Sequence, residues 1–161
     1  MFEQFARETR ETVRRAVEVA EAEDAAVVEA EHLLIALVDP PRDPVGRALA
    51  QAGFTADSIR SARDAEFRSA LAAVGVHTTR PMPPASARLR RGRSTRFAPS
   101  AKLVLERTVK HATDSRTRRI TNRDLLRAVV SAEVGRIPQL LAELGTTPTD
   151  LLQRAGGSQA A

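Results

Sequence analysis

The sequence repeats itself at an offset of 92 residues, and this repeat constrains the fold more than any other feature. Residues 31–38 (EHLLIALV) return as residues 123–130 (RDLLRAVV). The same offset, without gaps, relates Phe5 to Phe97, Leu49 to Leu141, Gly53 to Gly145 and Thr55 to Thr147. Apolar positions and helix-terminating residues coincide in both copies, so the chain is predicted to be a tandem repeat of one structural unit.

The spacing of apolar residues predicts four helices in each unit. Residues 3–23 carry apolar side chains at every third or fourth position, as an amphipathic helix does. Residues 29–38 are almost entirely apolar after their first turn, which predicts a helix buried on most sides. Shorter patterns predict a third helix over residues 45–52 and a fourth from about residue 56 towards residue 70.

Residues that start or end helices support this division. Pro44 suits the first position of the third helix, and Gly53 suits the position just after its end. Thr55 is a suitable N-cap for the fourth helix. In the second copy, Thr121 and Thr147 are each followed three residues later by an aspartate, which is a pattern similar to a capping box.

Composition agrees with an all-α fold. The chain has five Phe but no Tyr or Trp, so its core must consist of Leu, Val, Ile and Ala, which favours helices over a sheet. We therefore predict an all-α protein with two pseudo-symmetric four-helix repeats packed on each other in one domain. The predicted boundaries are 1–161 for the domain, 3–73 for repeat 1, 74–96 for a mobile basic linker and 97–155 for repeat 2.

The basic residues are concentrated around the predicted linker. No acidic residue lies between Glu66 and Glu106, whereas the interval contains eight Lys and Arg residues. A basic segment can neutralise nucleic-acid phosphates. However, no aromatic residue that could stack on bases lies between Phe67 and Phe97. A solvated linker is the preferred interpretation, and a small nucleic-acid-associated regulator is the alternative.

Other classes of protein are disfavoured. There is no cysteine, the N-terminus lacks the pattern of a signal peptide, and no apolar run approaches the length of a membrane span, so we expect a cytoplasmic protein. His32, His77 and His111 are too scattered for a metal site. The sequence has neither a catalytic constellation nor a G-x-x-x-x-G-K-[ST] phosphate loop, so we expect no enzyme activity and no cofactor.

The repeat and its motifs resemble the N-terminal domain of the Clp chaperone ATPases, in particular the ClpC type. The matching segments are 1–5 (MFEQF), 31–34 (EHLL), 49–53 (LAQAG) and 97–106 (FAPSAKLVLE). The resemblance covers nearly the whole chain except the linker and the last residues. Because the family's ATPase motif is absent and the linker is longer and more basic than usual, the chain resembles a free-standing N domain.

The resemblance implies a candidate phosphoarginine site. Some domains of the family bind phosphoarginine through one glutamate at the start of the second helix of each repeat. Glu31 matches the first of these positions, whereas Arg123 replaces the second glutamate and Ala30 replaces a threonine that usually precedes the first. The alternative is that Glu31 is a first-turn acid favoured by the helix dipole, and we prefer this alternative.

The resemblance also implies a partner-binding surface shared by the first helices of the two repeats. In related domains, adaptors and cyclic-peptide antibiotics dock there. The matching residues are Phe2, Arg10, Val13, Val17, Phe97, Lys102, Leu105 and Glu106. The alternative is that the apolar members are core residues. Phe2 lies outside the helical period, so it is the apolar member that we expect to be exposed.

These observations predict a non-enzymatic binding module of the Clp protease system. It would be a monomer that acts as an adaptor, a regulator or a decoy. Its expected partners are Clp chaperone and protease components, substrate or adaptor peptides and cyclic-peptide antibiotics, but neither nucleic acid nor a membrane. Besides the nucleic-acid alternative, a truncated Clp-like paralogue that only binds the chaperone ring is a third hypothesis.

Overall fold

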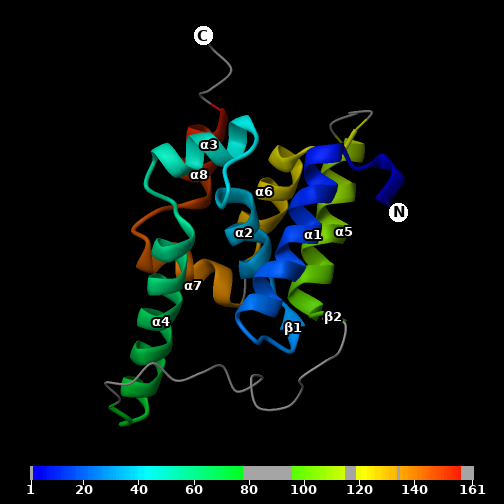
Figure 1. Cartoon of the computed structure of the whole chain (residues 1–161). Coiled ribbons are helices and arrows are strands. Elements are labelled where there is room, and N and C mark those ends of the chain that lie inside the picture. The colour runs from blue at the N-terminus through cyan, green and yellow to red at the C-terminus, as the bar shows by residue number, and fades with distance from the viewer. Residues whose placement is uncertain (1, 78–95, 115–118, 134, 157–161) are drawn as a thin grey trace.

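The computed structural model describes residues 2–77, 96–114, 119–133 and 135–156. In these residues the chain forms eight α-helices, one 3₁₀ helix and two short strands (Figure 1). The elements are, in order, η1 (Phe2–Gln4), α1 (Arg7–Ala22), β1 (Val27–Val28), α2 (Ala30–Val38), α3 (Pro44–Gln51), α4 (Ala56–Ala73), β2 (Arg96–Phe97), α5 (Pro99–Asp114), α6 (Asn122–Val130), α7 (Arg136–Glu143) and α8 (Pro148–Gly156). The prediction of an all-α fold with four helices in each repeat is confirmed.

Two short extended contacts join the repeats crosswise. Strand β1 pairs in parallel with β2, which places Val28 opposite Phe97, and Phe5 forms a parallel bridge with Ile120. Phe5 and Phe97 are counterparts at the offset of 92, and so are Val28 and Ile120. Each contact is therefore the image of the other, which is the relation expected of a pseudo-two-fold axis.

The helices also interlock across the repeats. Helix α1 packs on α2, and α5 packs on α6, while α2 and α6 meet at the centre. The third helix of each repeat packs on the fourth helix of the other, so that α3 contacts α8 and α4 contacts α7. Because the outer layers are exchanged in this way, the two repeats form one core rather than two independent bundles.

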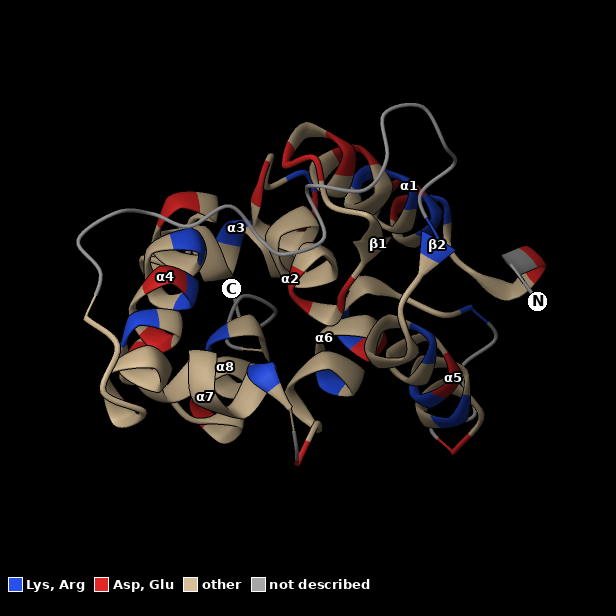
Figure 2. Ribbon diagram, turned by 90° about the horizontal axis from the view of Figure 1, so that it is seen from below, with Lys and Arg blue, Asp and Glu red and all other residues tan. Residues whose placement is uncertain are grey.

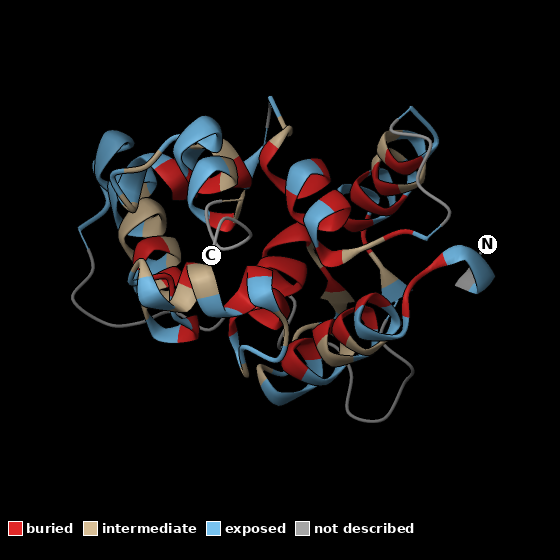
Figure 3. Ribbon diagram, turned by 90° about the horizontal axis from the view of Figure 1, so that it is seen from above, coloured by how far each residue is buried: buried red, intermediate tan, exposed pale blue. Residues whose placement is uncertain are grey.

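Helices α2 and α6 form the buried centre of the protein (Figure 3). All nine residues of α2 are buried, and α6 exposes only Arg123 and Arg127. Fully buried leucines such as Leu33 and Leu125 each stabilise the fold by about 1.5–3 kcal/mol relative to exposure. The repeated apolar segment of the sequence is thus the core of each repeat.

The predicted helix boundaries are largely confirmed by hydrogen bonds. Pro44 is the first residue of α3, and the Thr55 hydroxyl accepts from the Ser58 amide at 3.1 Å. Thr121 and Asp124 form a capping box, and the Thr147 hydroxyl accepts from the Asp150 amide at 3.2 Å. Gly53 and Gly145 both have a positive φ, 88° and 64°, which is the conformation that favours glycine just after a helix.

The first helix differs from its predicted range of residues 3–23. It begins at Arg7, because Phe5 is extended, only 2% exposed and bridged to Ile120. An apolar residue at the helical spacing is thus used to join the repeats rather than to extend the helix. Helix α4 continues to Ala73, slightly beyond its expected end. Most of the predicted linker, residues 78–95, lies outside the described residues.

The two halves of the chain carry opposite charge. Residues 1–77 contain nine Lys and Arg against 14 Asp and Glu, whereas residues 96–161 contain 11 against six. Figure 2 shows acidic positions on the elements around α1 and basic positions along α5 and β2. In the described part of the chain, none of the helices is both long and apolar enough to cross a membrane.

Candidate functional site

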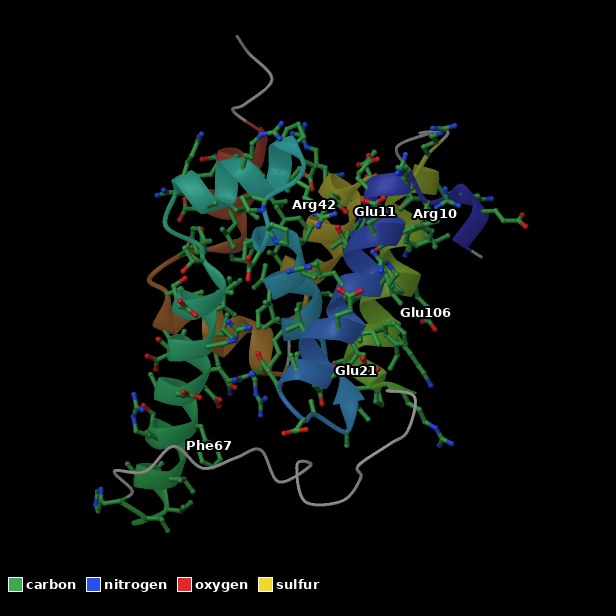
Figure 4. The ribbon with its side chains drawn as sticks, in the orientation of Figure 1. Arg10, Glu11, Glu21, Arg42, Phe67 and Glu106 are labelled. Carbon is green, nitrogen blue, oxygen red and sulfur yellow. The ribbon has the colours of Figure 1, made fainter. Side chains whose placement is uncertain are left out.

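The residues predicted to form a shared partner-binding surface come from α1 and α5, which lie at the same end of the molecule (Figures 1 and 2). Arg10, Lys102 and Glu106 are exposed. Figure 4 shows Arg10 and Glu106 on the side of the molecule that carries the N-terminus. The exposed part of this surface, which we call the α1–α5 surface, is therefore mainly charged.

The apolar members of this set are more buried than the charged ones. Val13 and Leu105, which are counterparts in the two repeats, are each only 6% exposed and belong to the core. Val17 and Phe97 are half-buried and pack against the core. The side chain of Phe2 lies outside the described residues. Only Val17 and Phe97 of the described apolar members could contribute contact area at the surface.

Glu31 is 4% exposed, and both of its carboxylate oxygens are engaged in ion pairs. Its Oε1 accepts from Arg63 on α4, and its Oε2 accepts from Arg136 at the start of α7, each at 3.2 Å. A buried carboxylate with two guanidinium partners holds α2, α4 and α7 together. Any arginine-like ligand of Glu31 would have to replace one of these internal partners.

Glu31 belongs to a larger polar network at the same end of α2. Glu23 accepts from Arg60 at 2.8 Å and from Arg63 at 2.6 Å. The imidazole Nδ1 of His32 accepts from the Glu29 amide at 2.8 Å, and its Nε2 lies 3.7 Å from Glu23. His32 therefore has a structural role at the start of α2, as part of the cap of this helix.

The network determines the ionisation of Glu23 and Arg63. Burial by itself would raise the pKa of the Glu23 carboxyl, but the nearby His32 imidazole and the hydrogen bonds from Arg60 and Arg63 outweigh it and hold the pKa well below its usual range. Burial would lower the pKa of the Arg63 guanidinium, but Glu23 and Glu31 together raise it. Both groups are charged at neutral pH, so the network acts as a set of ionic contacts.

An open groove with a volume of about 350 Å³ lies beside this network. Its walls are the start of α2 (Glu29, Ala30 and Glu31), one face of α5, and the segment that leads into α7. The α5 residues are Ser100, Leu103, Val104 and Arg107, whose spacing places them on one helical face. The α7 side consists of Ala132, Glu133, Gly135, Arg136 and Ile137. We call this site the open groove.

The pseudo-two-fold produces a second, narrower groove, with a volume of about 30 Å³. Its α1 wall includes Glu8, Glu11, Thr12 and Arg15, which are the counterparts of the α5 residues of the open groove. Here the side-chain amide of Asn122 donates to Asp43, whose other oxygen accepts from the Val45 amide at 2.8 Å. We call this site the closed groove.

The open groove has small residues at both positions of the Asn122–Asp43 contact. The counterpart of Asn122 is Ala30, and the counterpart of Asp43 is Gly135. Gly135 has φ 97° and ψ −162°, a conformation adopted essentially only by glycine, and it provides no side-chain cap for α7. The Asn122–Asp43 hydrogen bond beside the closed groove therefore has no equivalent beside the open one.

The second candidate phosphoarginine position has a different environment from the first. Arg123 is exposed, and its guanidinium lies against Gly156, where an added Cβ would come within 2.8 Å of Nη2. No ion pair involves Arg123 among the residues that the structure describes. The two copies of this position thus differ in charge, burial and partners.

Metal binding finds no support in the described ranges, which contain no group of three or more His, Cys, Asp or Glu residues that could hold a metal ion. The histidines are dispersed, with His32 buried, His111 half-buried and His77 exposed.

Sequence reasoning did not identify the open groove. The available signal was the substitution of Ala30 and Gly135 for the polar counterparts Asn122 and Asp43. These substitutions indicate a groove only if the start of α2 lies next to the start of α7. The tertiary structure shows that they do.

Comparisons with known proteins agree with the fold. Residues 4–144 match the family described as Clp repeat (R) N-terminal domain. Among solved structures, the N-terminal domain of the caseinolytic protease-associated chaperone ClpD from Arabidopsis thaliana is similar, with a TM-score of 0.70, 19% identity, and coverage of 100% of this chain and 97% of that one. The Hsp104 N-terminal domain from Candida albicans gives a TM-score of 0.65 at 14% identity, covering 98% of this chain and 93% of that one. No curated protein sequence matches the chain.

Proposed function

The chain belongs to the Clp repeat N-terminal domain family, and from this premise we propose that it is a non-enzymatic binding module of the Clp protease system. In this proposal it binds Clp components, adaptors, substrate peptides or cyclic-peptide antibiotics through the α1–α5 surface. It acts on degradation as an adaptor, a regulator or a decoy. It needs neither a metal nor a cofactor to do so.

The observation that carries this proposal is the exposure of charged residues at matching places of α1 and α5. Arg10 and Lys102 are counterparts at the offset of 92, and both are exposed cations on the first helix of their repeat. Glu106 lies one helical turn after Lys102 and is also exposed. A partner that meets both helices at once would find two cations related by the pseudo-two-fold, next to the half-buried Val17 and Phe97.

Binding by this surface requires no chemistry beyond complementarity. Charged rim residues steer a partner and select its charge pattern, whereas buried apolar contacts supply most of the affinity. A decoy sequesters its ligand by mass action, so it needs only comparable affinity and sufficient abundance relative to the competing chaperone.

Calorimetric titration with a cyclic-peptide antibiotic that binds a ClpC-type N-terminal domain tests the proposal. We expect saturable binding that weakens at least tenfold in the Arg10→Glu/Lys102→Glu variant, because a charge reversal at the rim introduces repulsion. Lys110→Glu is the matched control, since Lys110 is an exposed cation of α5 outside the proposed surface. Absence of binding to the unaltered chain, or an equal loss in the control, would contradict the proposed surface.

Capture of partners from a cell lysate distinguishes the proposal from the nucleic-acid alternative. Recovery of a Clp chaperone or of peptides supports the binding module. Salt-sensitive recovery of nucleic acid, lost on deletion of residues 80–96, would favour a nucleic-acid-associated regulator. The same preparation can be titrated with free phosphoarginine, and binding that is abolished by Glu31→Ala would assign Glu31 to that ligand despite its pairs with Arg63 and Arg136.

A further inference from the structure

The open groove is a site of ligand-binding size that the α1–α5 surface does not use. Its volume of about 350 Å³ is within the range of small-molecule and peptide-end sites. It is formed by the face of α5 that carries Leu103 and Arg107, whereas Lys102 and Glu106 of the proposed surface lie on the neighbouring face. The two sites could therefore be occupied independently.

The α5 wall of the open groove is apolar at its mouth. Leu103 is 46% exposed and is one of three large apolar side chains that are exposed in the described part of the chain. Val104 and Ile137 continue this wall towards the core. In the closed groove the counterpart of Leu103 is Glu11, which pairs with Arg7 at 3.1 Å. At this position the open groove thus offers a large exposed apolar side chain, whereas the closed groove has an ion-paired acid.

Three carboxylates (Glu29, Glu31 and Glu133) and two guanidiniums (Arg107 and Arg136) line the open groove. Glu31 is neutralised by Arg63 and Arg136. The Glu29 carboxylate accepts from the Ser100 hydroxyl at 2.6 Å and from the His32 backbone amide in the capping box of α2. Neither Glu29 nor Glu133 forms an ion pair with a described residue. A ligand with a compact cation would therefore be favoured beside these two carboxylates.

Arg107 adds a hydrogen-bond donor to the same wall. Its Nη1 donates to the Ser131 carbonyl at 3.3 Å, which fixes the guanidinium at the edge of the groove. A guanidinium has five N–H donors, so others remain for a ligand acceptor. The groove therefore combines a cation-binding end, an apolar wall and a donor.

We propose that the open groove binds the amino-terminal residue of a polypeptide whose first side chain is apolar. The α-ammonium group pairs with Glu29 and Glu133, and the first side chain packs on Leu103. The carbonyl oxygen of the first residue accepts a hydrogen bond from Arg107. A free amino terminus supplies a cation, an apolar side chain and an acceptor within one residue. Capture of a chain terminus is a known mode of peptide recognition, and an ammonium group forms strong hydrogen bonds with carboxylates.

Fluorescence polarisation with two synthetic octapeptides tests the proposal. Both begin with leucine and carry a fluorophore at the C-terminus, but one has a free amino terminus and the other is N-acetylated. We expect the free peptide to bind about tenfold more tightly than the acetylated one. Acetylation removes the α-ammonium group, so the acetylated peptide loses at least one charge-assisted hydrogen bond. Its affinity should fall as the pH rises from about 7 to 9, because an α-amino group has a pKa of about 7.7–8.0, whereas the acetylated peptide should show no such change.

Substitutions locate the binding in the groove. Glu133→Gln and Leu103→Glu should each weaken binding of the free peptide several-fold, and both positions are exposed enough to tolerate the change. Glu143→Gln is the matched control, since Glu143 is an exposed acid of α7 outside the groove, and it should bind as the unaltered chain does. Equal affinity for the two peptides, or unchanged affinity in both groove variants, would overturn the proposal. Neither result would contradict the proposal that partners bind the α1–α5 surface, because that proposal is tested separately with the Arg10→Glu/Lys102→Glu variant.

Discussion

The open and closed grooves are lined by counterpart residues of α5 and α1 but differ in volume, about 350 Å³ against about 30 Å³. In the closed groove, Asn122 reaches across to Asp43, and Asp43 in turn caps α3. In the open groove, the counterparts Ala30 and Gly135 have no polar side chain with which to bridge the same gap. The duplicated fold thus provides two corresponding positions, which differ in volume and in the presence of this polar contact.

The difference extends to the charged residue beside each groove. Glu31 next to the open groove is buried and paired, whereas its counterpart Arg123 is exposed and lies against Gly156. In the first copy, the charged side chain of Glu31 therefore holds α4 and α7 to the core. The second copy keeps its cation at the surface, where it contributes little to packing.

The largest expected effect is a difference in stability between the counterparts Glu31 and Arg123. Glu31→Ala should lower the free energy of unfolding by about 3 kcal/mol, because it removes a carboxylate that is only 4% exposed and joins Arg63 of α4 to Arg136 of α7. Arg63 keeps Glu23 and Arg136 keeps Glu66, so the cost is at the lower end for a buried ion pair. Arg123→Ala should change it by less than about 0.5 kcal/mol. Urea titration followed by far-ultraviolet circular dichroism measures both values, since the chain has no Trp or Tyr for fluorescence. Equal losses would contradict the asymmetry.

A second prediction concerns the acid dependence of the network behind the open groove. The folded-state pKa of Glu23 is lowered, so its contribution to stability is present above the unfolded-state pKa of about 4.3 and is lost as the pH falls below that value. Glu23→Gln should therefore cost about 2 kcal/mol near neutral pH and progressively less in acid. Glu18→Gln, at an exposed acid of α1, the helix that Glu23 follows, is the control and should show little change. A cost that stays constant with pH would argue against ionic pairing of Glu23.

The smallest expected effect concerns the contact that closes the second groove. Asn122→Ala should open the closed groove while lowering stability by only about 1 kcal/mol. The cost is small because the Oδ1 atom of Asn122 is buried without a partner among the described residues, so its removal offsets part of the lost hydrogen bond. Unfolding measurements give the stability, and a crystal structure of the variant shows the groove. If the groove stays closed, the Asn122–Asp43 contact is not what fills it.

Much of the fold could be predicted from the sequence because the two copies report the same pattern independently. The offset that relates Phe5 to Phe97 and Gly53 to Gly145 identified the helices and their ends. The capping threonines Thr55 and Thr121 were predicted from local hydrogen-bonding rules, which act within a few residues of the chain.

The start of the first helix was predicted wrongly for a related reason. Phe5 fits the helical spacing of α1, so nothing local separates it from the helix. Its extended conformation depends on Ile120, which is distant in the sequence and joins it through the parallel bridge. The apolar spacing alone was also insufficient to distinguish surface from core for Val13 and Leu105, whose burial depends on the helices packed against them.

The sequence by itself determined the duplication, the helical class and the family. Apolar periodicity and helix-terminating residues are local properties, and both occur in each copy of the repeat. Only the tertiary structure decided which copy carries an accessible groove. That outcome depends on the approach of Ala30 to Gly135 and of Asn122 to Asp43, which lie far apart in the chain. Long-range placements of this kind leave no periodic signal in the sequence.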